Sequence, residues 1–169
     1  CGIFGDVYVD VDGDADILDD GVGADGVIVH LYQYGGDNTP DGVDDVLIAS
    51  EATDLTGEYM FSDLADDTYW VVVDSTDVAP AAYNSGYDLG DVWAEQTYGP
   101  IFSMTYSGGV YTAHAAGPLY GGMEAEDSDD AAALTNAEHV AGAAIGSADV
   151  TNVNFGCSVN VVVRTGDSD

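Results

Sequence analysis

The apolar residues of this chain fall in short runs with a period of two and without a helical period. Residues 2–9 alternate apolar with small or polar side chains, and the runs 26–32, 46–50, 58–61 and 69–73 are rich in β-branched and aromatic residues. Glycine, aspartate, asparagine and proline separate these runs, as is typical of turns between strands. The pattern predicts an all-β fold, an immunoglobulin-like or prealbumin-like β-sandwich.

The composition of the sequence changes at about residue 75. The segment 75–122 is richer in glycine and has scattered tyrosines. Within it, 101–106 and 110–114 flank Ser107-Gly108-Gly109, which predicts a β-hairpin. Three further elements are predicted, namely a short alanine-rich helix at 130–138 and late strands at 150–155 and 159–163.

These elements predict a sandwich with a long glycine-rich insertion and a C-terminal extra strand. Residues 1–75 together with 148–157 form the predicted sandwich, and 76–147 form the insertion or a small second lobe. Residues 158–169 contain the extra strand and a tail. This segment can be donated to a neighbouring molecule. The chain has 169 residues, 46% of them hydrophobic, so it is long and apolar enough to bury a core.

An acidic loop follows the first predicted strand, from Asp10 to Gly21. Carboxylates at every second position can converge on one centre if the backbone curls around it, as a calcium ion with six to eight oxygen ligands requires. The predicted ligands are Asp10, Asp12, Asp14, Asp16, Asp19 and Asp20. Gly13 and Gly21 stand where an EF-hand has other residues, so a different calcium loop is expected. The alternative is a solvated acidic loop.

A second acidic loop lies at residues 37–45. It combines turn-forming residues with carboxylates, and Asp37, Asp41 and Asp45 are weaker candidates for a second cation site. The proline at position 40 interrupts the spacing. Because such turn chemistry also occurs without an ion, an ion-free turn remains the alternative.

The charge of the chain is strongly one-sided. It has 32 acidic residues and a single basic one, Arg164, which gives a net charge of −31. Such a surface repels phosphate backbones and anionic lipid and attracts divalent cations. We therefore expect neither nucleic acid nor a membrane surface as a partner. No apolar run is long enough to predict a membrane span.

The two cysteines and three histidines offer little catalytic chemistry. Cys1 and Cys157 predict a disulfide within one chain or between neighbouring chains, with a lipid on Cys1 as a further alternative. His30 lies in a strand pattern, where a satisfied core or surface histidine is expected. His114 and His139 have no nearby cysteine or second histidine at the spacing of metal ligands, and no nucleophile that would make them catalytic. We predict no catalytic residue and no enzymatic activity.

Several of these segments together resemble the calcium-binding B-type repeats of serine-aspartate-repeat adhesins, the SdrD-B-like or Cna-B-like family. The resemblance covers roughly residues 3–75 and 148–157. The residues that carry it are Gly5-Asp6-Val7-Tyr8-Val9-Asp10, Gly26-Val27-Ile28-Val29, Thr53-Asp54 with Gly57, Tyr59 and Phe61, and Val150-Thr151-Asn152-Val153-Asn154-Phe155-Gly156. Trp93-Ala94-Glu95-Gln96-Thr97-Tyr98-Gly99-Pro100 is similar to segments that follow such repeats in large secreted bacterial proteins.

This resemblance implies a β-sandwich outside the cell or at the cell surface, with calcium held by loops between strands and a structural or adhesive role without catalysis. It also makes Asp54 a weaker ligand candidate, through the turn motif. Ala15 departs from the glycine that the repeats usually have, which leaves the number of ions open.

Two functions follow from these observations. The first is an extracellular structural subunit, stabilised by calcium, that forms a filament by strand exchange with other copies of itself. Val159, Val161 and Val163 would form the exchanged strand, because they follow what looks like the closing strand of the sandwich. The alternative is a calcium-rigidified spacer or ligand-binding module of a large cell-surface adhesin, in which the same residues are a linker.

Overall fold

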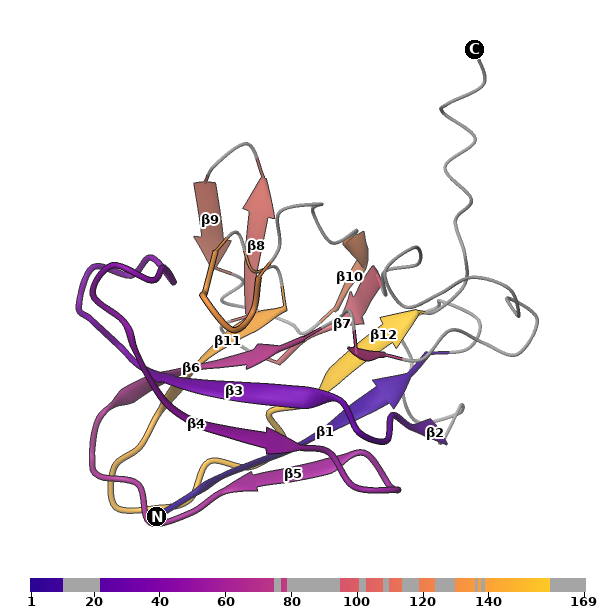
Figure 1. Ribbon diagram of the computed structural model, residues 1–169, viewed down its shortest axis with the longest axis horizontal. Helices are drawn as coiled ribbons and strands as arrows, with labels where there is room; N and C mark the ends of the chain where they lie inside the picture. The colour runs from indigo at the N-terminus through magenta and orange to yellow at the C-terminus, as the bar shows by residue number, and fades with distance from the viewer. Residues whose placement is uncertain are drawn as a thin grey trace.

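The structure is a two-sheet, all-β sandwich. The computed structural model describes residues 1–10, 22–74, 77–78, 95–100, 103–107, 110–113, 119–123, 130–135, 137 and 139–158. Their strands, β1 to β12, build two sheets that pack face to face (Figure 1). The predicted all-β sandwich is confirmed. Among the described residues, no helix is long and apolar enough to cross a membrane.

The first sheet is organised around β1. Its strand order is β10-β7-β12-β1-β2, and β5 also pairs with β1. Strands β1 and β12 run parallel, with Val7 opposite Phe155 and Val9 opposite Cys157. The bounds are β1 (Ile3–Val9), β2 (Val22–Gly23), β5 (Glu58–Phe61), β7 (Glu95–Tyr98), β10 (Leu119–Met123) and β12 (Phe155–Ser158). A strand in this central position has neighbours on both edges, which explains the low exposure of β1.

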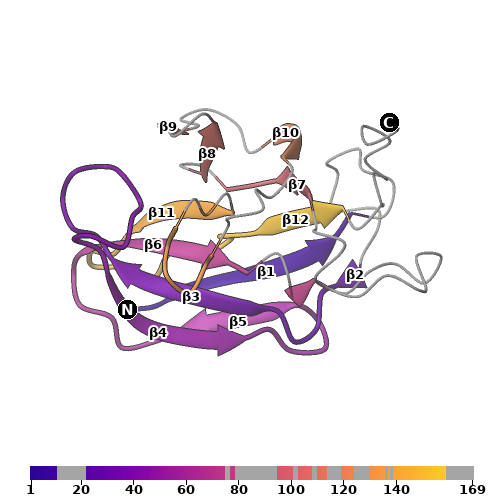
Figure 2. The ribbon, with the colours of Figure 1, turned by 45° about the horizontal axis from the view of Figure 1, so that its top comes forward.

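The second sheet has the order β4-β3-β6-β11-β8-β9. Its strands are β3 (Ile28–Gln33), β4 (Val46–Ala52), β6 (Thr68–Val73), β8 (Ser103–Ser107), β9 (Val110–Ala113) and β11 (Val140–Ala144). Strands β4 and β9 are therefore the edges of this sheet. Figure 2 shows β4 at the margin of the sandwich, beside β5 of the first sheet.

Both faces of the second sheet are buried at β3 and β6, because successive side chains of a strand point to opposite faces. One set lies in the core between the sheets, and includes Val29, Leu31, Val71 and Val73. The other set, Tyr32, Trp70 and Val72, packs on the far face against Met104, Ala131, Leu134 and Val140. The sheet therefore carries a second, smaller apolar cluster outside the sandwich, and this cluster lies behind the candidate site described below.

A turn, and not the predicted helix, covers the second cluster. The backbones of Asp130 and Thr135 exchange two hydrogen bonds of 2.9 and 3.0 Å, which close a loop over residues 131–134. Leu134 has a φ of 52° and is 1% exposed. The helix prediction at 130–138 was wrong for residues 131–135, because burial of Ala131 and Leu134 against the sheet outweighs the helix preference of alanine.

Residues 76–147, predicted as an insertion or a second lobe, contribute strands to both sheets. Strands β7 and β10 extend the first sheet, and β8, β9 and β11 extend the second. Strand β11 pairs along its whole length with β6, from Val140 opposite Val72 to Ala144 opposite Thr68. In the described residues this segment is thus part of the sandwich. The predicted hairpin is confirmed as β8 and β9.

The closing strand lies later than the prediction of 150–155. Strand β12 begins at Phe155, and Val150 makes only an isolated parallel bridge with Ile3. The backbone between them still holds β1, because the N–H groups of Val150 and Val153 donate to the carbonyls of Gly2 and Phe4, and the N–H of Phe4 donates to the carbonyl of Val150. The predicted strand at 159–163 lies outside the described residues.

Candidate metal centre

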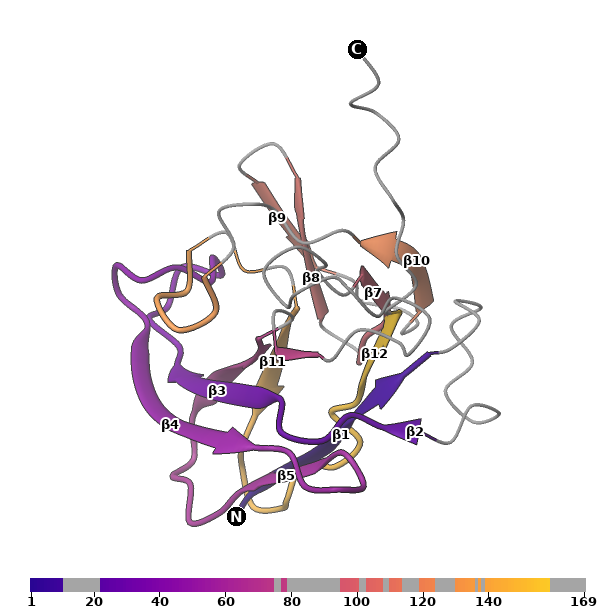
Figure 3. The same ribbon diagram turned by 45° about the vertical axis from the view of Figure 1, so that its right-hand side comes forward.

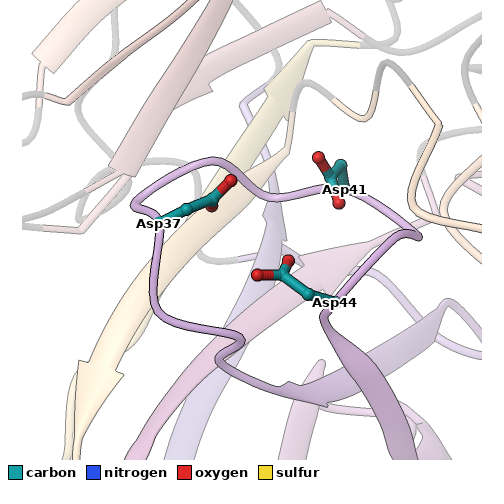
Figure 4. A group of neighbouring side chains, drawn as sticks. All are labelled: Asp37, Asp41 and Asp44. Atoms are coloured by element: carbon teal, nitrogen blue, oxygen red, sulfur yellow. The ribbon is translucent and has the colours of Figure 1, made fainter.

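Three aspartates converge in the loop that joins β3 to β4. Asp37, Asp41 and Asp44 each offer one carboxylate oxygen, and these oxygens lie within 4.8 Å of one another. Figure 4 shows the three carboxylates pointing toward one another across the loop. Two ligands on opposite sides of a calcium ion are separated by about 4.6–5.2 Å, twice the metal–oxygen distance. The spacing of the three oxygens is therefore compatible with a single metal ion.

Local hydrogen bonds orient two of the three carboxylates. Asp37 Oδ1 accepts the backbone N–H of Thr39 at 2.8 Å, and Asp41 Oδ1 accepts that of Val43 at 2.8 Å. Each is a turn in which the side chain binds the backbone two residues later. Each of these bonds uses one carboxylate oxygen. The second oxygen of Asp37 and of Asp41 therefore remains available to bind a metal ion.

A fourth aspartate, Asp45, fixes the loop through hydrogen bonds. Its side chain is 8% exposed and accepts the backbone N–H groups of Gly35 at 2.7 Å and of Asp41 at 2.9 Å. It also accepts the indole N–H of Trp70 at 3.1 Å. Burial raises the pKa of Asp45, and the backbone N–H groups of Asp41 and Gly35 partly oppose this shift. Asp45 is thus a structural carboxylate that ties both ends of the loop to the sheet.

The loop also rests on aromatic and backbone contacts. Tyr34 packs edge-on against Trp70, with ring centroids 5.5 Å apart, and its hydroxyl accepts the N–H of Asn38 at 2.9 Å. On the far side, a side chain at Gly42 would meet the carbonyl oxygen of Ala133 at 2.6 Å. Figures 1 and 3 show this loop beside the turn 131–134. The acidic loop is therefore held by the second apolar cluster and by its covering turn.

A glycine makes room for the third carboxylate. A Cβ atom added to Gly35 would lie 2.5 and 2.6 Å from the two carboxylate oxygens of Asp44. Asp44 therefore lies directly over the backbone of Gly35, where only a glycine leaves space for it. The obstacle is the end of a short side chain, so an alanine at position 35 would displace the carboxylate and leave the backbone in place.

We expect Gly35→Ala to weaken cation binding by about tenfold or more, which is 1.4 kcal/mol or more, and to change the stability of the cation-free protein much less. Isothermal titration with calcium and denaturation in a chelator measure the two effects separately. Gly146→Ala is the matched control, because nothing lies within 4 Å of a Cβ atom at that position. Equal calcium affinity of the Gly35→Ala protein and the control would show that Asp44 is not a ligand.

The convergence agrees only in part with the expectation for this loop. Asp37 and Asp41 belong to the group as predicted, but the third member is Asp44 and not Asp45. Neighbouring residues of an extended chain point to opposite sides. Only one of Asp44 and Asp45 can therefore face Asp37 and Asp41, and the other enters the sheet. The sequence shows that Asp44 and Asp45 are adjacent. Adjacency alone does not indicate which of the two side chains faces Asp37 and Asp41.

Of the loop predicted to follow β1, only Asp10 lies in the described residues. Its side chain is fully buried, and its backbone N–H donates to the carbonyl of Cys157 at 2.9 Å. The other predicted ligands, Asp12, Asp14, Asp16, Asp19 and Asp20, lie outside the described residues. The calcium site predicted there stays a prediction.

Asp54 has a structural role in the turn between β4 and β5. Its Oδ1 accepts the N–H groups of Thr56 at 2.8 Å and Glu58 at 3.1 Å and the hydroxyl of Thr56 at 2.7 Å. These bonds, that of the Thr56 hydroxyl first, lower the pKa of Asp54. Asp54 belongs to no carboxylate group of metal-binding size among the described residues. The weaker ligand role suggested for Asp54 stays a prediction.

The predicted disulfide is not formed, and both cysteines are free thiols. Cys1 precedes β1, whereas Cys157 lies opposite Val9 near the other end of that strand. At about 3.3 Å per residue these positions are on the order of 25 Å apart, whereas a disulfide needs Cα atoms within about 7 Å. Cys157 is fully buried, whereas Cys1 is exposed, so the predicted bond between neighbouring chains stays a prediction. Burial and then the charge of Asp10 raise the pKa of Cys157 to about 12.

The two described histidines are both buried and lie in different surroundings. His30 is 7% exposed, and its Nδ1 lies 2.8 Å from Ser50 Oγ, which confirms the expected satisfied histidine. His139 is fully buried, neither ring nitrogen has a hydrogen-bond partner, and burial lowers its pKa to about 4. His114 lies outside the described residues.

No protein-family model matches the chain. The carboxylate group therefore rests on its own geometry. Its three side chains offer only oxygen ligands, from a loop fixed by a buried carboxylate and two aromatic rings. Such an arrangement can hold a metal ion.

Proposed function

We propose that this protein is a non-enzymatic structural subunit outside the cell, stabilised by calcium, that assembles with other copies into a filament or surface layer by strand exchange. The observation that carries the proposal is the group of Asp37, Asp41 and Asp44 on its pre-ordered loop. The resemblance of the sequence to calcium-binding B-type repeats supports the same reading and stays a prediction.

The chemistry of the group favours calcium over transition metals. Three carboxylates and no histidine or thiolate make a hard, all-oxygen ligand set. Calcium accepts additional ligands from backbone carbonyls and water and tolerates irregular geometry, whereas magnesium demands a near-ideal octahedron. A partly exposed loop that supplies three carboxylates on one side suits the more tolerant ion.

The charge of the chain explains why calcium would control assembly. With 32 acidic residues and one basic residue, two copies repel wherever their surfaces approach. Salt screens charges more than about 8 Å apart at physiological ionic strength, but charges in direct contact are screened much less. A divalent ion bound at the contact would remove this local repulsion and rigidify the loop at the same time.

We expect large particles of the purified chain in millimolar calcium and their dissolution after addition of a chelator. Light scattering of the same sample before and after chelation measures this. Magnesium at the same concentration is the control for general screening by divalent charge, and we expect it to support assembly less well. A monomer in both calcium and chelator would contradict the assembly function and would favour the spacer or ligand-binding module of an adhesin.

A further inference from the structure

Strand β4 has one edge that pairs with no other strand among the described residues. The strand pairs with β3 on one side and ends its sheet on the other. Within the described residues, no backbone hydrogen bond joins β4 to β5, the nearest strand beyond that edge. Such a row of unpaired N–H and C=O groups can pair with an added strand.

The side chains of this edge are unusually apolar for an exposed strand. Val46, Leu47 and Ile48 are 57%, 44% and 44% exposed. Edge strands are normally protected by lysine or proline, and β4 contains neither. Two protective features are present, the exposed carboxylate of Glu51 and an irregularity in the pairing with β3 between Leu31 and Tyr32, but the three apolar residues stay in solvent. The edge therefore offers both main-chain groups and apolar contacts.

From this edge we infer that β4 receives residues 159–163 of a second copy, in antiparallel orientation, with Arg164 of that copy placed at the acidic loop. This inference rests on the proposed function, because it names the acceptor for the exchanged strand. The segment Val159-Asn160-Val161-Val162-Val163 has no carboxylate and has the β-branched composition of a strand. It can thus approach an acidic molecule without adding repulsion.

Charge complementarity fixes the orientation. If Val163 lies opposite Val46 in an antiparallel pair, then Val159 lies opposite Ser50 and Arg164 lies opposite Asp45. Arg164 is the only basic residue of the chain, and it then lies at the loop that holds Asp37, Asp41 and Asp44. A parallel pair would bring it to the single carboxylate of Glu51. Antiparallel pairing is also slightly more stable per residue.

The segment cannot reach this edge within its own chain. It directly follows β12, which ends at Ser158 in the middle of the first sheet. In the first sheet β1 lies between β12 and β5, so two strand spacings, about 10 Å, separate β12 from β5. Strand β4 belongs to the second sheet and lies beside β5. One peptide unit spans 3.8 Å, and Val159 would have to lie opposite Ser50. The donor is therefore a second copy, and repetition of this contact gives an open filament.

Two single substitutions block the two halves of the contact. Leu47→Lys places a charge on the acceptor edge, and Val161→Asp places one on the donor strand. Leu55→Lys is the matched control, because this leucine is 83% exposed in the turn after β4 and receives the same change of charge. Circular dichroism checks that all three variants fold. Sedimentation velocity in millimolar calcium measures the assembly of the full chain.

We expect the wild type and Leu55→Lys to assemble, and both Leu47→Lys and Val161→Asp to stay monomeric. A mixture of these two monomeric variants should form a dimer of one copy of each and nothing larger, because one intact acceptor and one intact donor remain. Arg164→Glu should weaken wild-type assembly by about tenfold or more, and added salt should reduce the difference.

Three results would overturn the inference. Assembly of Leu47→Lys like the wild type, with Val161→Asp monomeric, would place the acceptor elsewhere and leave strand exchange intact. A wild type that is monomeric in calcium at all concentrations would remove both the inference and the proposed function. Unchanged assembly of Arg164→Glu would contradict the antiparallel placement at the acidic loop.

Discussion

Calcium should raise the melting temperature of this protein, and the double substitution Asp41→Asn and Asp44→Asn should abolish the increase. A ligand at 100 times its dissociation constant stabilises the folded state by about 2.7 kcal/mol. For a domain of this size, this corresponds to roughly 5–11 °C. The asparagine at position 41 keeps the oxygen that accepts the N–H of Val43, so the turn is preserved while the charge is lost.

In a chelator the same double variant should melt at the wild-type temperature or slightly above it. Two carboxylates 4 Å apart repel by about 1 kcal/mol in water and about 4 kcal/mol at an effective dielectric constant of 20. Removal of two charges from the group relieves this repulsion. Differential scanning calorimetry with and without calcium gives all four melting temperatures, and Asp66→Asn, at an exposed position, serves as the control.

This experiment also separates the two acidic loops. If calcium stabilises the Asp41→Asn, Asp44→Asn protein as much as the wild type, the stabilising ion binds elsewhere in the chain. The double substitution Asp12→Asn and Asp14→Asn then tests the loop that follows β1. Loss of the calcium effect in both double variants would mean that both loops bind ions.

The second large effect is expected at His139, where His139→Leu should stabilise the protein in mild acid. The pKa of His139 is lowered from 6.5 to about 4 in the folded state. Because the fold favours the neutral ring, the titration of this histidine has no effect on stability above pH 6.5 and destabilises the protein as the pH falls from 6.5 toward 4. At pH 5 the cost is about 2 kcal/mol, and leucine removes it.

The measurement is denaturant unfolding of the wild type and His139→Leu at pH 8 and pH 5, in a chelator. Burial raises the pKa values of Asp6, Asp45 and Asp77, so these carboxylates stabilise the fold as the pH falls. These carboxylates contribute equally in both proteins. The difference in unfolding free energy between the wild type and His139→Leu therefore reports on His139 alone. A difference that is the same at both pH values would show that His139 does not titrate between them.

At neutral pH the variant should also gain some stability, because leucine has no polar atom to satisfy. A buried group without a hydrogen-bond partner costs about 1–3 kcal/mol, and neither nitrogen of His139 has one. His30→Leu is the contrasting variant. His30 has Ser50 as a partner, so its replacement should destabilise the protein at pH 8.

The strands were largely predictable because their signal is local. Alternation along β1 and the β-branched runs of β3 and β6 identified these strands within about two residues of their observed bounds. The hairpin of β8 and β9 followed from its glycine-containing turn. In each case the pattern of side chains along one segment is enough to specify an extended chain with a buried face.

The candidate metal centre was less predictable, because its residues are close for two different reasons. The sequence placed Asp37 and Asp41 in one turn, and their local hydrogen bonds act over two residues. The choice of Asp44 over Asp45 depends instead on Trp70, a residue of β6 far along the chain, whose indole N–H binds Asp45. A contact over such a separation leaves no mark in the local pattern.

The sequence by itself determined that this chain is β-rich, strongly acidic and able to bury a core, because composition and a period of two are properties of each segment alone. The tertiary structure decided which segments became neighbours. Strand β11 reached its place between β6 and β8, Ala131 and Leu134 entered a covering turn in place of a helix, and the two cysteines came to lie at opposite ends of β1. These outcomes depend on which apolar faces are buried together, and that is a property of the whole chain.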